Sequence, residues 1–171
     1  MPLVDLLDEA YAWTGKRLAA VPPSALDAPT PCPDWNLRQL LNHLVGALAM
    51  QLDAVEGTPA AQGVTFEEVA DRAARVWAEP GVLDRTCPMP FGPTPARVVL
   101  VLHVTEVVLH GWDVGVATGE RATIPGWLAE PLLDAGKPLV TDAHRGPVFG
   151  PELPAGDTGE SRLLAFYGRT P

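Results

Sequence analysis

The sequence predicts an all-α protein, an antiparallel four-helix bundle with an extra helix and a short C-terminal appendage. Two observations support this fold class. Apolar residues recur at three- and four-residue spacing in several segments, and these segments carry helix-start or helix-stop signals at their ends. No segment sustains the alternation of apolar and polar residues that a sheet would need. We expect one domain over residues 1–171, in which 145–171 form a C-terminal loop and short helix.

The first two expected helices are separated by the proline-rich stretch VPPSALDAPTPCP. The first helix covers residues 3–20. The second begins after Asn36, which is a suitable N-cap because Gln39 follows three residues later in a capping box. It continues to about Val55. Its apolar stripe consists of Leu37, Leu40, Leu41, Leu44, Leu48 and Leu52.

Similar signals delimit three further helices. Thr65 and Glu68 repeat the capping-box pattern for a third helix that ends near residues 80–81. Thr94 and Pro95 suit the N-cap and first position of a fourth helix, which runs to about 118 with Gly119 after it. A fifth helix is expected over about 125–143. The segment GPVFGPELPAGDTGE predicts an ordered loop or short strand, and SRLLAFYGR predicts one or two helical turns.

Composition and charge exclude several classes of protein. Of 171 residues, 47% are hydrophobic and 19% are charged, which is typical of a globular domain. The net charge of −9 argues against nucleic acid or an anionic membrane as a partner. No secretory signal pattern opens the chain, and we expect no apolar run near the roughly 20 residues of a membrane span. These features predict a cytoplasmic protein. Cys32 and Cys87 both precede proline and predict plain thiols, with a thiol catalyst as the alternative.

The stretch HVTEVVLHGWD places an ionisable stripe on an otherwise apolar helix. At about 100° per residue, His103, Glu106, His110 and Asp113 fall on one narrow face together with Val99. A helix that is apolar nearly all round belongs in a core, where unpaired ionisable groups are strongly disfavoured. The stripe must therefore be paired, bound to a ligand, or turned toward solvent.

Three interpretations of the stripe remain open at this point. The first is a solvated face, and the second is a buried polar network in which Glu106 pairs with His103 or His110. The third is a metal site, because Glu106 and His110 lie one turn apart and can reach a common ion. His43 in LLNHLVG supplies a third candidate ligand, since helical bundles build metal sites from facing helices.

Three blocks of the sequence resemble a known family. TPCPDWNLRQLLNHLV (30–45) is similar to the opening of the mycothiol-dependent maleylpyruvate isomerase family, within the wider DinB/YfiT-like metalloproteins. EVVLHGWDVGVATG resembles the family's Glu-x-x-x-His-x-Trp-Asp pattern. SRLLAFYGRTP resembles the close of a short actinobacterial metal-binding branch. The resemblance implies a DinB/YfiT-like bundle and extends over nearly the whole chain.

The resemblance also implies roles for individual residues. His43, Glu106 and His110 match the family's metal ligands. Asp113 matches an acidic residue near the thiol cofactor. His103 has no assured counterpart, and we expect it to support a ligand or to handle a proton. Trp35 and Trp112 match aromatic positions and are expected to pack.

The resulting functional prediction is a metal- and thiol-dependent transferase or isomerase. A divalent ion, zinc or alternatively nickel, would activate a low-molecular-weight thiol, mycothiol by resemblance, for attack on a small electrophile. Two alternatives are a non-catalytic bundle that binds a metal or small molecule, and a metal-assisted hydrolase. The expected partners are small molecules, with no nucleic acid or membrane, and a homodimer is compatible with the bundle.

Overall fold

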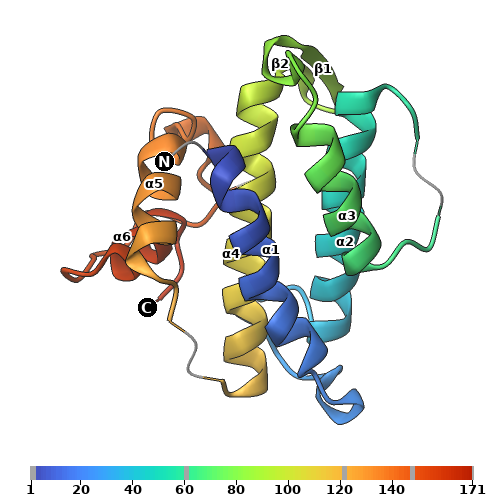
Figure 1. The fold of residues 1–171 in the computed structure, drawn as a ribbon. Helices are drawn as coiled ribbons and strands as arrows, with labels where there is room; N and C mark the ends of the chain where they lie inside the picture. Colours follow the sequence, from blue (N-terminus) through green and yellow to red (C-terminus); the bar gives the residue numbers. More distant parts are fainter. Residues whose placement is uncertain (1–2, 60–61, 121–122, 147–148, 171) are drawn as a thin grey trace.

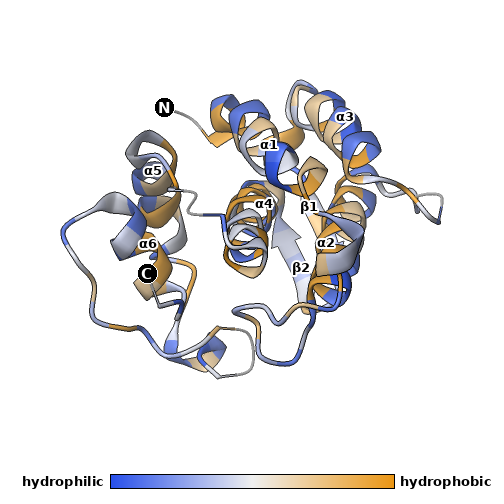
Figure 2. Ribbon diagram, turned by 90° about the horizontal axis from the view of Figure 1, so that it is seen from below, coloured by the Kyte–Doolittle hydropathy of each residue, from blue (hydrophilic) through white to orange (hydrophobic). Residues whose placement is uncertain are grey.

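The computed structural model describes residues 3–59, 62–120, 123–146 and 149–170. Helix α4 lies at the centre, with α1, α2 and α3 on one side and the shorter α5 and α6 on the other (Figures 1 and 2). It contacts α1, α2 and α5 directly. The helices are α1 (Leu3–Ala19), α2 (Leu37–Glu56), α3 (Phe66–Trp77), α4 (Ala96–Thr118), α5 (Gly126–Gly136) and α6 (Gly159–Phe166), with short 3₁₀ turns η1 (Pro23–Ala25), η2 (Val82–Asp84) and η3 (Asp142–His144).

The predicted helix-start signals of α2 and α3 are confirmed. The Asn36 side chain accepts a hydrogen bond from the Gln39 backbone, and the Gln39 side chain accepts one from the Asn36 backbone, at 3.0 Å each. Thr65 and Glu68 make the same reciprocal pair before α3. These contacts satisfy backbone N–H groups that the first turn of a helix leaves free. The predicted stop of α4 at Gly119 is also confirmed, with φ at 76°.

A short β-hairpin precedes α4, which departs from the all-α prediction. Strand β1 (Thr86–Met89) pairs antiparallel with β2 (Gly92–Pro95). Each strand has only four residues and the two contain three prolines, so no alternating pattern could be recognised. The hairpin also moves the start of α4, since Pro95 rather than Thr94 is its N-cap.

Helix α5 is shorter than predicted, and its last residue is a glycine because Tyr167 leaves no room there for a side chain. It ends at Gly136 instead of continuing to about 143. A Cβ at Gly136 would lie 2.1 Å from the Tyr167 hydroxyl oxygen, so a larger residue would displace the C-terminal segment that packs here. The chain then bends into η3, where the His144 ring accepts a hydrogen bond from the Thr141 backbone. This bend starts the C-terminal appendage, which includes α6.

Helix α4 supplies much of the hydrophobic core. Among the described residues it is the one helix long and apolar enough to cross a membrane by length and composition. The expectation that no such run exists was therefore wrong. In this fold 72% of the qualifying window is buried inside the protein, as a central helix requires. Figure 2 shows it surrounded by the other elements.

Candidate metal centre

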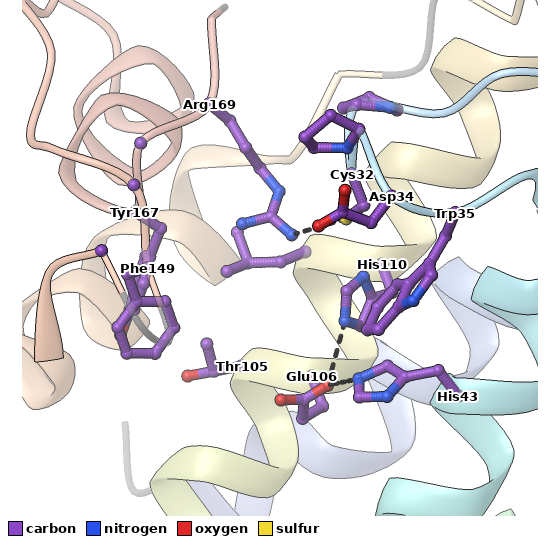
Figure 3. A pocket seen from close by; sticks show the side chains of 16 residues that line it. Cys32, Asp34, Trp35, His43, Thr105, Glu106, His110, Phe149, Tyr167 and Arg169 are labelled. Carbon is purple, nitrogen blue, oxygen red and sulfur yellow. Dashed lines mark hydrogen bonds and ion pairs between the residues drawn. The ribbon is translucent and has the colours of Figure 1, made fainter.

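Three potential metal ligands converge from two helices. His43 comes from α2, and Glu106 and His110 come from successive turns of α4. The Glu106 Oε2 atom lies 3.4 Å from His43 Nε2 and 3.1 Å from His110 Nε2 (Figure 3). One donor atom from each residue lies within 4.8 Å of the others, which is close enough for all three to hold one ion. The predicted spacing on α4 and the position of His43 thus bring these side chains together.

The Glu106 carboxylate carries the strongest sign that a cation belongs here. Its Oε2 atom is buried and makes no hydrogen bond within the described part of the chain, although two imidazole nitrogens lie nearby. Burial alone would raise the pKa of Glu106, but the two histidines outweigh it and the pKa falls well below its usual range. The group is therefore a carboxylate whose Oε2 atom has two imidazole nitrogens at ion-pair distance but no hydrogen bond, as expected of a metal ligand.

A second carboxylate fixes the other side of the His110 ring. Asp113 is completely buried, and its Oδ2 atom lies 2.9 Å from His110 Nδ1. Burial lowers the pKa of His110, but the hydrogen bonds to Asp113 and neighbouring groups raise it well above its ordinary value. With Nδ1 bonded to Asp113, the Nε2 atom faces Glu106. Metal-binding histidines commonly show this arrangement, with a carboxylate behind the ring.

Two residues near Asp113 were not predicted from the sequence. Arg169 donates from Nε to Asp113 Oδ1 at 2.8 Å and from Nη2 to Oδ2 at 2.7 Å. The Cys32 thiol lies 3.6 Å from the same Oδ2 atom. Burial raises the pKa of Asp113, yet Arg169 and His110 outweigh burial and lower it. The only sequence signal for Arg169 was its place in the block SRLLAFYGRTP.

The three candidate ligands, with Cys32 and Arg169, line a pocket of about 710 Å³. One wall is the loop before α2, where the Trp35 ring lies 4.2 Å from the His43 ring, centroid to centroid. The opposite wall is the C-terminal appendage, which contributes Phe149 and Tyr167 as well as Arg169 (Figure 3). The appendage is thus part of the site. Trp112, in contrast, packs in the hydrophobic core as expected.

His103 lies outside this pocket, in the interior between α1, α2 and α3. Its Nε2 atom is 2.7 Å from the Tyr11 hydroxyl and its Nδ1 atom is 2.9 Å from Gln51 Oε1. The ring is completely buried, and burial lowers its pKa to about 3. No ligand residue of the candidate site is among its hydrogen-bond partners in the described part of the chain. Its seven-residue separation from His110 corresponds to about 10 Å along the helix axis.

The fold and site together define a class: a DinB-like helical bundle with a His-Glu-His cluster able to hold a metal ion. The family model described as mycothiol maleylpyruvate isomerase N-terminal domain matches residues 7–85, which include His43. The chain belongs to this family, as the sequence motifs predicted.

Two similar proteins come from Mycobacterium tuberculosis: "Uncharacterized protein MT0763" of strain CDC 1551 / Oshkosh, and "Uncharacterized protein Rv0738" of strain ATCC 25618 / H37Rv. Each is 32% identical over 163 residues, covering 90% of this chain and 90% of the relative. The similarity therefore extends well beyond the matched N-terminal region and across the part of the chain that holds Glu106 and His110. No solved structure matches the chain.

Proposed function

We propose that the protein binds one divalent metal ion through His43, Glu106 and His110, and that this ion is zinc. The observation that carries the proposal is the convergence of two imidazole nitrogens on the buried, unpartnered Oε2 atom of Glu106. Two histidines and one carboxylate form a donor set that catalytic zinc sites use. Nickel is the alternative ion, because imidazole also suits it.

We further propose that the site activates a low-molecular-weight thiol, mycothiol by family membership, for transfer to a small electrophile. A divalent ion with three protein ligands leaves a coordination position open and lowers the pKa of a thiol that binds there. The pocket beside the ligands has a volume of about 710 Å³, which is in the range of small-molecule sites. It offers room for thiol and electrophile next to one another. Such a protein would act in the cytoplasm, where the thiol is available.

The walls of the pocket support this chemistry in two ways. Trp35, Phe149 and Tyr167 provide aromatic surface that can exclude water from a bound electrophile. Asp113 holds the His110 ring from behind, so that Nε2 remains directed at Glu106. The hydrolase alternative receives less support, because His103, its expected base, is enclosed by Tyr11 and Gln51.

The first experiment is the metal content of the purified protein, measured by elemental analysis. We expect about one equivalent of zinc in the wild type and in the control H144A, whose histidine is exposed and bonded to Thr141. We expect none in H43A. A wild type that stays folded and metal-free after dialysis against zinc and nickel would overturn the metal site.

The thiol proposal is tested separately with the zinc-loaded protein. The rate at which mycothiol or a model thiol adds to activated alkenes, epoxides and halides is compared with the rate without protein. Acceleration by wild type and H144A but not by H43A would support the proposal. Tight binding of thiol with no acceleration for any electrophile would instead establish a non-catalytic binding protein.

A further inference from the structure

The Arg169–Asp113 ion pair joins the C-terminal appendage to the central helix. The two residues are 56 positions apart, and their side chains are largely or completely buried, 13% and 0% exposed. Two guanidinium nitrogens reach two carboxylate oxygens at 2.8 and 2.7 Å. This two-point contact fixes the plane of the carboxylate as well as its position.

The backbone around Arg169 is itself held in place. Its N–H donates to the carbonyl of Leu164 at 2.8 Å, and the N–H of Gly168 donates to Ala165 at 3.0 Å, which closes the end of α6. Gly168 adopts a φ of 76°, and a Cβ there would lie 2.7 Å from the Gly150 Cα atom. The Arg169 side chain therefore projects from a rigid point, which is what an orienting contact needs.

Asp113 transmits this constraint to a proposed metal ligand. The Oδ2 atom that accepts from Arg169 Nη2 is the same atom that lies 2.9 Å from His110 Nδ1. The Asp113 carboxylate accepts two hydrogen bonds from Arg169 and can only act as an acceptor toward His110 as well. It therefore favours the form of the ring in which Nδ1 carries a hydrogen and donates to Oδ2. Nε2, on the far side of the ring, is then directed at Glu106, and once it carries no proton its lone pair can bind an ion held between the two residues. A carboxylate that could rotate would leave both the ring angle and this tautomer unfixed.

We infer that Arg169 is a positioning residue of the metal centre, which acts through Asp113 to orient His110. The inference rests on the proposed metal site. It also makes the appendage a working part of that site, since the guanidinium comes from the end of the chain beyond α6. Arg169 acts on the metal only through the Asp113 carboxylate.

The test is a double-mutant cycle on zinc affinity, measured by competition with a chromophoric chelator. We expect R169Q to weaken zinc binding about ten- to hundredfold, the usual effect of removing a residue that supports a ligand. If Arg169 acts through Asp113, the double variant R169Q/D113N binds zinc within about twofold of D113N alone. The visible spectrum of the cobalt-loaded protein should change in R169Q, because the ligand geometry changes.

The matched control is R162Q. Arg162 also belongs to the appendage and pairs with Glu130 at 3.3 Å, but both residues are well exposed and lie away from the pocket. It should bind zinc like the wild type. R169K keeps the positive charge beside Asp113 but cannot bind both carboxylate oxygens in one plane, so it should also weaken zinc binding. Wild-type affinity in R169Q or R169K, or losses that multiply in the double variant, would overturn the inference.

A measurement without metal separates this inference from the proposed function. In the metal-free wild type and R162Q, the His110 Nδ1 proton bonded to Asp113 should give a sharp downfield resonance in the proton NMR spectrum. In R169Q it should broaden through exchange with water. If the wild type binds no zinc but this difference is seen, the metal site fails while Arg169 still positions His110. A sharp resonance retained in R169Q would overturn the positioning role.

Discussion

His103 and His110 occupy the same face of α4, two turns apart, yet they have opposite surroundings. His103 is completely buried and bonded to two uncharged partners, Tyr11 and Gln51. His110 is also buried, but it lies between the two carboxylates of Glu106 and Asp113 and borders the pocket. Both ring nitrogens of His103 are satisfied within the protein. At His110 one nitrogen faces a carboxylate oxygen that still lacks a hydrogen bond.

The difference shows that helical phase alone does not define a site. The helical periodicity correctly placed both histidines on one face of α4. The chemistry of each histidine, however, depends on the elements that pack around its own turn of the helix. Around His103, helices α1, α2 and α3 close the interior, and burial keeps the ring neutral by lowering its pKa to about 3. Around His110 the neighbours are the loop before α2 and the C-terminal appendage, which leave a pocket. One position therefore stabilises the fold, whereas the other can bind a ligand.

The largest expected effect is on zinc affinity, which should differ strongly between a His110 variant and a His103 variant. We expect H110Q to weaken zinc binding at least a hundredfold, because it removes one of three proposed ligands. H103Q should bind zinc within about twofold of the wild type, since the hydrogen bonds of His103 go to Tyr11 and Gln51 and not to a ligand. The measurement is chelator competition on both variants. Equal losses in the two would show that His103 belongs to the site, contrary to the comparison.

The second prediction concerns the contribution of His103 to the stability of the fold. H103A removes a buried ring and leaves the Tyr11 hydroxyl and the Gln51 carbonyl without a partner. We expect a loss of about 2–4 kcal/mol in the free energy of unfolding, from urea denaturation of the metal-free protein. The control H144A, at an exposed histidine, should lose no more than about 0.5 kcal/mol. A loss in H103A as small as that in H144A would contradict the structural role.

The third prediction concerns pH. The pKa of His103 is lowered to about 3 in the folded protein, whereas a histidine in the unfolded chain titrates near 6.5. Between these values the unfolded chain binds a proton that the folded protein does not. Stability that is fully present above pH 6.5 is therefore lost as the pH falls toward 3, by at most about 1.4 kcal/mol per pH unit.

The variant H103Q isolates this contribution. A glutamine amide can accept from Tyr11 and donate to Gln51, but it does not titrate. Urea denaturation at several pH values should show a stability that falls less steeply below pH 6.5 in H103Q than in the wild type. Parallel curves for the two proteins would show that His103 does not cause the acid sensitivity.

The sequence predicted local features well because their signals are local. The reciprocal contacts of Asn36 with Gln39 and of Thr65 with Glu68 are encoded within four residues. The approach of Glu106 and His110 follows from one turn of helix. The hairpin before α4 was missed because its strands are too short and too rich in proline for alternation to be visible.

Longer-range contacts could not be predicted, for a physical reason. Arg169 meets Asp113 across 56 residues, and Cys32 meets it across 81. Such contacts depend on how loops and the appendage pack against α4. This packing produces no periodic pattern in the sequence from which it could be predicted. The same limitation applies to His103. Its phase agreed with the stripe, but only the positions of Tyr11 and Gln51 show that it is enclosed.

The smallest predicted effect concerns Trp35, which lines the pocket and stacks on the proposed ligand His43. Trp35 stacks on His43, with ring centroids 4.2 Å apart and planes tilted by 35°. An aromatic pair contributes about 0.5–1.5 kcal/mol beyond burial, which corresponds to a few-fold to about tenfold in affinity if the stack holds His43 in its binding orientation. We expect W35L to weaken zinc binding within that range and W35F to weaken it less, because phenylalanine retains an aromatic face. Chelator competition on the two variants checks the order. If W35L binds zinc as tightly as the wild type, the α2 backbone alone orients His43, and Trp35 serves only as pocket wall.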